Sequence, residues 1–310
     1  MDQIKKSQLK CLEAVVTTGS IRKAAAKLDI QPSYVSRQIQ MLERETGAIL
    51  FDRQSAGAVP TPATAHLLEY YRMWNAQLEH LESQLGSLED LGSGSVIVAA
   101  SEGLIPSLTD EVLWDFNRQY PNIRLTVQTK ATVEIVHDVQ KGIVHIGMAY
   151  SPPASEHLRF HAHAKHRVVA AMCPEHPLAR ETGNIPFGRA IAYPFATMPA
   201  IYGLGRLIEA VAAAENLRFS PIMQANTLDL LTRFALAGRG VAMVTDYSVR
   251  QEVAEGRLVA RVIDHPMLGN QYAKVFVNSE RMLTRAASEL LHWIETRMSV
   301  FNVPMVAESV

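Results

Sequence analysis

The chain has 310 residues, a hydrophobic content of 48%, a net charge of −1 and two cysteines. This length suits about two or three domains, and the apolar content is sufficient for large cores. Two cysteines cannot form a disulfide framework, and no apolar run approaches the roughly 20 residues that a membrane-spanning helix needs. We therefore expect a cytoplasmic protein with no signal peptide and no contact with a membrane.

Positive charge is concentrated at the N-terminus. Residues 1–62 contain nine Lys and Arg against six Asp and Glu, a net charge of +3, whereas residues 63–92 have a net charge of −4. A small basic unit is suited to the phosphate backbone of a nucleic acid, and its modest excess of charge predicts a moderate salt dependence.

The segment from Ser20 to Glu43 predicts two short helices joined by a tight turn. Ser20 is a good N-cap, because its hydroxyl can accept a hydrogen bond from a free N–H group at the helix start. Ala24, Ala25 and Leu28 form a narrow apolar stripe at helical spacing. Pro32 suits the first position of the second helix, since it has no N–H group to leave unsatisfied.

The second helix, from Pro32 to Glu43, predicts an amphipathic element with a polar outer face. Val35, Ile39 and Leu42 would face inward. We expect the outward residues to read DNA in the major groove, with Arg forking onto guanine and Gln onto adenine. The alternative is a surface helix pair whose polar residues face only solvent. The residues expected to point outward are Ser33, Tyr34, Arg37 and Gln38.

The next residues predict a two-stranded wing. Residues 49–53 form a short apolar run that ends at Arg53, a glycine-containing tip follows at 55–57, and a second run covers 59–61. Arg53 would meet a phosphate group of the DNA backbone.

With these residues the first 61 positions resemble the LysR-type transcriptional regulators. By that resemblance residues 1–61 are a winged helix-turn-helix domain, although Pro32 stands where many members have Gln, and Pro60 and Thr64 also depart from the pattern. The resemblance implies DNA contacts from Ser20, Gln31, Pro32, Ser33, Tyr34, Ser36, Arg37, Gln38 and Arg53. The matching residues are Gly19, Ser20, Ala24, Ala25, Leu28, Val35, Ser36, Arg37, Gln38, Ile39, Leu42, Glu43, Gly47, Leu50, Phe51, Arg53 and Thr61.

Residues 62–92 predict a long connector helix followed by a hinge. Apolar residues recur with alternating spacings of four and three, which favours a coil between two chains over a helix packed only on its own domain. A homodimer of this kind would place two reading helices on a partial inverted repeat of double-stranded DNA. The residues of this predicted dimerisation seam are Leu67, Tyr71, Trp74, Leu78, Leu81, Leu85 and Leu88.

Residues 93–300 predict two α/β lobes, because short apolar strands alternate with helical segments. We expect lobe 1 at about 93–166 and 267–300, lobe 2 at about 167–266, and a tail at 301–310. This multidomain α/β arrangement is similar to the effector-binding domain of LysR-type regulators and to periplasmic binding proteins. The residues that carry the similarity are Pro106, Tyr120, Pro121, Gly142, residues 176–179, Gly238 and Gly240.

Ligands of open α/β sheets bind beyond the carboxyl ends of the strands, where helix N-termini favour anions. We therefore expect a small organic effector, with a carboxylate as one candidate, although Glu102 argues against a strongly anionic ligand. The alternative for each Ser or Thr is helix capping. The expected effector-binding residues are Ser101, Glu102, Thr129, Thr132, Ile201, Thr227 and Met243.

Four histidines lie within ten residues, at 157, 161, 163 and 166. Their spacing matches no familiar metal motif, so we expect a titrating, solvent-facing edge and neither a metal site nor a cofactor.

The sequence therefore predicts a DNA-binding regulator controlled by a small molecule, and not an enzyme. An enzyme or a solute-binding module on the two-lobed domain is the alternative. The resemblance further implies a dimer of dimers, and contact with RNA polymerase if the protein activates transcription.

Overall fold

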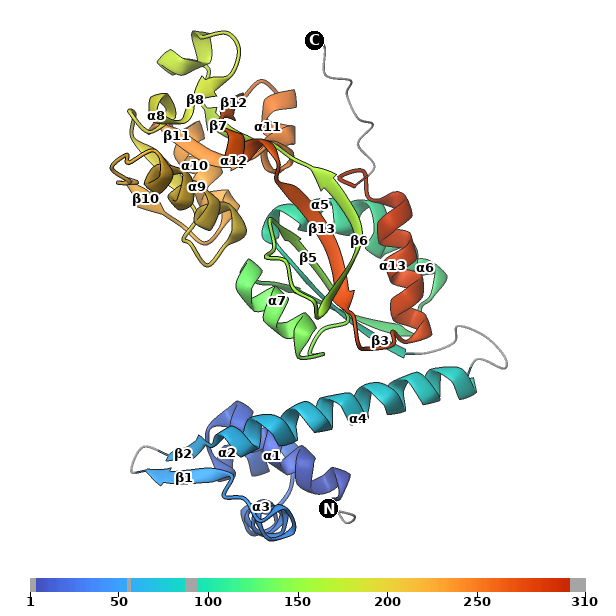
Figure 1. Ribbon diagram of the computed structural model, residues 1–310. Helices are drawn as coiled ribbons and strands as arrows, with labels where there is room; N and C mark the ends of the chain where they lie inside the picture. The colour runs from blue at the N-terminus through green and yellow to red at the C-terminus, as the bar shows by residue number, and fades with distance from the viewer. Residues whose placement is uncertain (1–3, 55–56, 87–93, 302–310) are drawn as a thin grey trace. The chain divides into compact units, whose positions relative to one another are not determined.

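A computed structural model describes residues 4–54, 57–86 and 94–301. The chain divides into two compact units, Met1–Leu81 and Glu82–Val310. Each unit has its own hydrophobic core. Figure 1 colours the chain from blue at the N-terminus to red at the C-terminus.

The N-terminal unit is a three-helix core with a wing. Helices α1 (Lys6–Thr18), α2 (Ile21–Leu28) and α3 (Pro32–Thr46) are followed by the antiparallel strands β1 (Phe51–Gln54) and β2 (Gly57–Pro60), and then by the long helix α4 (Pro62–Gly86). The helix pair, the turn and the wing predicted from the sequence are confirmed. The buried apolar residues include Leu9, Leu12, Val15, Ala24, Ala25, Val35, Ile39, Leu42 and Leu50.

Local sequence explains the bounds of these helices. The Ser20 hydroxyl accepts a hydrogen bond from the Lys23 N–H at 3.5 Å, as an N-cap should. Asp29 ends α2 in the left-handed conformation with φ of 56°, and Pro32 occupies the first turn of α3. The chain therefore turns sharply between α2 and α3, which fixes the angle at which α3 leaves the core.

Lobe 1 of the C-terminal unit is built on a five-stranded sheet with the order β4-β3-β5-β13-β6. Strands β3 and β4, and β3 and β5, pair in parallel, whereas β13 is antiparallel to both β5 and β6. The strands are β3 (Gly94–Ala100), β4 (Ile123–Thr129), β5 (Ile146–Tyr150), β6 (Leu158–Lys165) and β13 (Tyr272–Asn278).

Helices cover both faces of this sheet (Figure 1). One face packs against a helical run and the C-terminal helix α13 (Arg285–Arg297), and the other packs against α7 (Thr132–Gln140). The helical run consists of η1 (Glu102–Leu104), α5 (Ile105–Leu108), the π-helical turn η2 (Thr109–Leu113) and α6 (Trp114–Gln119).

Lobe 2 is built on a six-stranded sheet with the order β10-β9-β11-β7-β12-β8. Its strands are β7 (Val168–Met172), β8 (Ile185–Pro186), β9 (Phe195–Thr197), β10 (Met223–Gln224), β11 (Val241–Thr245) and β12 (Val259–Asp264). Its helical elements are η3 (Pro177–Arg180), α8 (Phe187–Ala190), α9 (Gly203–Ala214), α10 (Leu228–Leu236), η4 (Asp246–Val249), α11 (Arg250–Ala254) and α12 (Pro266–Gly269).

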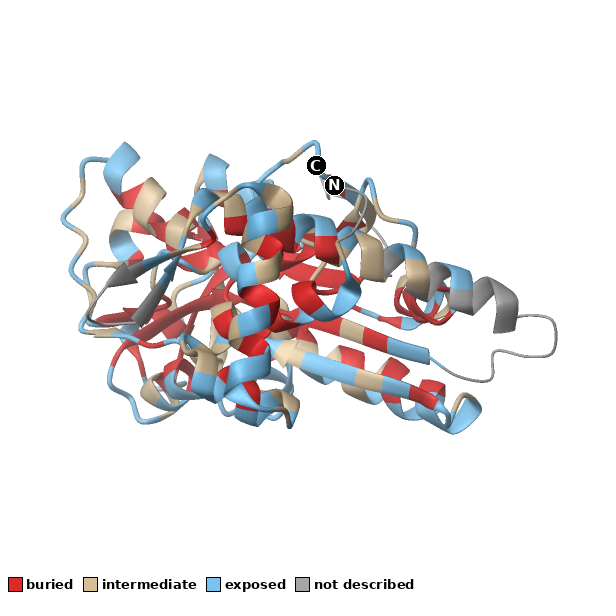
Figure 2. Ribbon diagram, turned by 90° about the horizontal axis from the view of Figure 1, so that it is seen from below, coloured by how far each residue is buried: buried red, intermediate tan, exposed pale blue. Residues whose placement is uncertain are grey.

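The chain crosses between the lobes twice, from β6 to β7 and from β12 to β13. Strand β7 is antiparallel to both β11 and β12. Buried residues lie along the strands and on the inner faces of the helices (Figure 2).

No helix among the residues described by the structure is long and apolar enough to cross a membrane.

Candidate nucleic-acid interface and ligand pocket

The outer face of α3 is a row of exposed polar side chains on a helix held from behind. Val35, Ile39 and Leu42 are buried in the core of the N-terminal unit. The exposed residues at helical spacing are Ser33, Arg37, Gln40 and Arg44, with Tyr34 beside them at 45% exposure. Arg37 forms no ion pair with any residue that the structure describes, so its guanidinium group is free to meet an external acceptor.

The predicted outward position of Gln38 is wrong. Its side chain is only 8% exposed and lies on the inner stripe of α3, because position 38 follows the buried Val35 by three residues. Gln40 is the exposed amide of this helix. Gln40 was not among the predicted DNA contacts, although its spacing of three residues from Arg37 identifies it as part of the same face.

The other predicted DNA contacts lie around the start of α3 and on the wing. Gln31 and Pro32 are exposed, and Ser36 is half-buried. Ser20 is half-buried and caps α2. Arg53 lies in β1 opposite Ala58, and its side chain is outside the described part of the structure.

The predicted seam on α4 divides into two parts. Leu67 and Tyr71 are buried in the core of their own unit, with Trp74 half-buried against it. The large apolar residues exposed on this helix are Tyr70, Met73 and Leu81, at 51%, 58% and 48%, and Leu78 is half-buried. The side chain of Leu85 and all of Leu88 lie outside the described residues. The N-terminal half of α4 therefore packs on its own domain, as the alternative interpretation of the seam had it.

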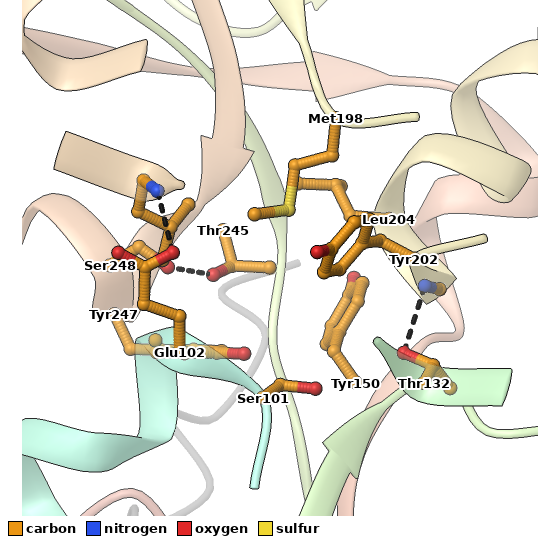
Figure 3. Close-up of a pocket in the computed structure, with 13 residues that line it drawn as sticks. Ser101, Glu102, Thr132, Tyr150, Met198, Tyr202, Leu204, Thr245, Tyr247 and Ser248 are labelled. Atoms are coloured by element: carbon orange, nitrogen blue, oxygen red, sulfur yellow. Dashed lines mark hydrogen bonds between the residues drawn. The ribbon is translucent and has the colours of Figure 1, made fainter. Parts of the chain in front are cut away.

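A small pocket lies between the two lobes of the C-terminal unit (Figure 3). Its walls come from the ends of β3, β5, β9 and β11 and from the starts of α7, α9 and α10. The cavity measures about 30 Å³, which is the share of liquid volume of about one water molecule. Its lining residues are Ser101, Glu102, Gly103, Thr132, Tyr150, Met198, Tyr202, Gly203, Leu204, Leu228, Thr245, Tyr247 and Ser248.

Hydrogen bonds across the pocket tie the lobes together. The Gly203 N–H at the start of α9 donates to Thr132 Oγ1 at 2.9 Å, and the Leu228 N–H at the start of α10 donates to Glu102 Oε2 at 2.7 Å (Figure 3). Each bond joins a helix N-terminus of lobe 2 to a side-chain oxygen of lobe 1. The close approach requires glycine at 203, since a Cβ there would lie 2.0 Å from the Tyr150 carbonyl oxygen.

Three tyrosines line the pocket and remain protonated at neutral pH. Burial raises the pKa of Tyr150, with Tyr247 and Asp246 adding to the effect, and burial likewise raises the pKa of Tyr247. Burial raises the pKa of Tyr202 too, followed by the nearby carboxylates of Glu134 and Glu102. The Tyr150 hydroxyl donates to the His166 carbonyl oxygen at 3.0 Å.

The structure brings only part of the predicted effector set together. Ser101, Glu102 and Thr132 line the pocket. Thr129 ends β4, Thr227 caps α10, and neither belongs to the lining. Ile201 is 52% exposed outside it. The predicted role of Met243 as lining is wrong, because this side chain is fully buried at the centre of β11.

The four neighbouring histidines do not converge. His157 Nδ1 lies 3.1 Å from Glu280, and His161 Nδ1 lies 2.9 Å from Glu295. The His163 ring packs edge-on against the Tyr272 ring, with 5.6 Å between the ring centroids. The expectation that all four face solvent is wrong for His166, which is 3% exposed, with its ring nitrogens 3.0 Å from Asp246 Oδ1 and 2.8 Å from the Val300 carbonyl oxygen. Among the described residues, no group of three potential ligands is placed to hold a metal ion.

Comparisons with known proteins agree on both units. Residues 7–65 match the bacterial regulatory helix-turn-helix proteins of the lysR family, and residues 89–299 match the LysR substrate-binding domain. The chain is 27% identical over 288 residues to the HTH-type transcriptional regulator CbbR of Sinorhizobium medicae, covering 86% of this chain and 85% of the relative. It is 25% identical over 285 residues to a probable RuBisCO transcriptional regulator of Porphyra purpurea, covering 90% of this chain and 89% of the relative.

Solved structures have the same fold. Full-length OxyR from Pseudomonas aeruginosa is similar with a TM-score of 0.74 and 14% identity, over 96% of each chain. Full-length CbnR in complex with its target DNA is similar with a TM-score of 0.59 and 16% identity, over 94% of this chain and 99% of that one. The exposed polar face of α3, the two-lobed unit and the two family matches lead to one conclusion: the chain belongs to the LysR family of DNA-binding transcriptional regulators, with an effector-binding domain after its helix-turn-helix domain.

Proposed function

We propose that the outer face of α3 reads base edges in the major groove, with Arg37 as the principal direct contact. The observation that supports this role is the exposure of Arg37, without a carboxylate partner among the described residues, at the centre of a polar helix face. A guanidinium group can donate two hydrogen bonds to guanine. Ser33, Tyr34 and Gln40 flank it on the same surface, whereas Gln38 is not part of the proposal because it is buried.

The flanking contacts position the domain on the duplex. Gln31, Pro32, Ser36 and Ser20 lie at or near the two helix starts, where phosphate oxygens meet free N–H groups. Arg53 on the wing would meet a phosphate in the same way. These contacts carry affinity and its dependence on salt, and Arg37 carries sequence preference.

The protein acts as a homodimer in this proposal, and its operator is a partial inverted repeat. Tyr70, Met73 and Leu81 expose apolar surface on α4, and a second copy of this helix is the partner that would cover it. Pairs of dimers would associate through the C-terminal units. Contact with RNA polymerase follows if the protein activates transcription, and its site of action is the cytoplasm, where the DNA is.

The proposed effector site is the pocket between the lobes. Its small volume and its two cross-lobe hydrogen bonds describe a closed form, so a metabolite would have to separate the lobes to enter. Separation of the lobes is then the event that the effector couples to DNA binding. Ser101, Glu102 and Thr132 on lobe 1 face Tyr202, Leu228 and Tyr247 on lobe 2 across this space.

An electrophoretic mobility assay with DNA from upstream of the protein's own gene tests the DNA-reading role. Arg37→Ala should weaken specific binding by about 1–3 kcal/mol, because one bidentate base contact is lost. Arg233→Ala is the matched control, since it removes an exposed arginine from α10 in the other unit and should leave the affinity unchanged. Equal affinity of Arg37→Ala and the parent protein for the operator would refute the role given to Arg37.

A further inference from the structure

The pocket proposed above as the effector site carries one formal charge in its described lining, and that charge is negative. Glu102 is the single ionisable carboxyl group among the lining residues, and no Lys, Arg or His is among them. Most sites for organic acids depend on a positively charged side chain or on free helix N-termini. The lining contains no positively charged side chain. Whether the pocket can bind an anion therefore depends on whether the N–H groups at the helix N-termini are free.

The first N–H groups of α9 and α10, two of the helices that line the pocket, are already bonded to oxygens of lobe 1. Glu102 Oε2 accepts the hydrogen bond from the first residue of α10, and Thr132 Oγ1 accepts one from the first residue of α9. The carboxylate thereby offsets the positive end of the α10 dipole. An incoming anion would have to displace this carboxylate and then remain beside it.

One oxygen of Glu102 remains available. Oε1 has no hydrogen-bond partner among the described residues, and the side chain is only half-buried. In Figure 3 the carboxylate of Glu102 lies beside Ser248, on the side of the pocket formed by α10 and η4. A ligand that donates hydrogen bonds would find an ionised acceptor there, and such charge-assisted bonds are the strong ones.

The rest of the wall fits a small donor-bearing ligand with an apolar body. Met198, Leu204 and Leu228 supply apolar surface, and the hydroxyls of Ser101, Thr245 and Ser248 can each accept a hydrogen bond. The negative charges of two carboxylates, Glu134 and Glu102, act on the Tyr202 side chain. The negative potential at this wall favours a cation over an anion.

We propose that the effector is a small organic cation, an ammonium group on a short apolar body, with Glu102 as its counter-ion. The proposal rests on the interlobe pocket being the effector site. It revises the carboxylate candidate that the sequence suggested, because the group that would attract a carboxylate is already bound by a carboxylate of the protein.

Thermal unfolding of the full chain with matched probes tests the ligand class. The probes are n-butylammonium and butyrate, which have similar apolar bodies and opposite charge, each at millimolar concentration and equal ionic strength. Butylammonium should raise the melting temperature and butyrate should not. In Glu102→Gln the affinity for butylammonium should fall about tenfold or more, because a charged acceptor is lost. The glutamine keeps an acceptor for the Leu228 N–H group, so the lobes stay joined.

Glu280→Gln is the matched control, since it makes the same change at an exposed carboxylate of lobe 1 and should keep the response of the parent protein. A larger shift with butyrate than with butylammonium would overturn the proposal. So would equal butylammonium binding by Glu102→Gln and the parent protein, or no shift with either probe. The DNA-binding assay without any probe is independent of these results, and it separates failure of the ligand class from failure of the proposed reading of DNA.

Discussion

His176 makes lobe 2 sensitive to acid. Its side chain is 8% exposed, and its Nδ1 accepts a hydrogen bond from the Leu178 N–H at 3.3 Å. Its ring packs edge-on against the Tyr193 ring, with 4.8 Å between the ring centroids. Burial lowers the pKa of His176. Because the unfolded chain then binds the proton more readily than the folded one, stability is complete above the unfolded pKa of about 6.5 and falls as the pH drops toward the folded value.

We expect His176→Asn to flatten this acid dependence, since asparagine keeps an acceptor near Nδ1 and cannot be protonated. The measurement is the melting temperature of the full chain between pH about 7.5 and about 5.5. The parent protein should lose stability over this range by a larger amount than the variant. A variant whose melting temperature falls in parallel with that of the parent protein would show that other groups cause the acid sensitivity.

Single residues also show where sequence analysis succeeds and where it stops. Ser20, Asp29 and Pro32 act through neighbours in the chain, so the turn of the helix pair could be predicted. Gln38 lies inside, where its helical spacing from Val35 places it, although its polar side chain favours an outward position. Residue type is a weaker guide than periodicity at the edge of a buried stripe.

At the scale of the element, α4 serves two roles along its length. Its first turns complete the core of the N-terminal unit through Leu67, Leu68 and Tyr71, while Met73 and Leu81 are exposed. A heptad pattern records which residues are apolar, but not which partner covers them. The sequence therefore predicted the helix correctly. It did not show which of the apolar residues pack on the N-terminal unit and which are exposed for another partner.

Leu67→Ala should lower the free energy of unfolding of the N-terminal unit by about 2–4 kcal/mol, because it removes buried methyl groups and leaves a cavity. His66→Ala, at an exposed residue of the same helix outside the proposed dimer contact, should change it by about 0.5 kcal/mol or less. Amide hydrogen exchange in α1 and α3 of the full chain reports the stability of this unit. Similar effects of the two substitutions would contradict the division of α4 described above.

The pocket also depends on elements that the sequence could not align. Tyr150 ends β5, Tyr202 precedes α9 and Tyr247 lies in η4, and the two crossings between the lobes bring them together. Strand ends could be predicted from apolar runs, which is why Ser101, Glu102 and Thr132 were identified. The positions of the lobe 2 residues depend on the long-range pairing of β7 with β11 and β12, which a local sequence pattern does not record.

At the scale of the whole molecule, assembly through α4 can be tested with charge. The double substitution Met73→Glu and Leu81→Glu should shift the protein from dimer toward monomer, because a carboxylate in an apolar contact is poorly solvated. Sedimentation equilibrium gives the dissociation constant, which should rise about tenfold or more. Ile222→Glu, on a lobe 2 residue that is 66% exposed, is the control and should leave the dimer intact. An unchanged dissociation constant in the double variant would place the dimer contact elsewhere.

The pairing of Lys165 with Tyr272 has a consequence for how this protein is built. These residues are direct neighbours across β6 and β13, so everything between them, including the entire six-stranded sheet, is carried in the bend of a single hairpin. The same geometry means that the covalent connection between the two sheets consists of two short neighbouring segments, residues 166–167 and 265–271.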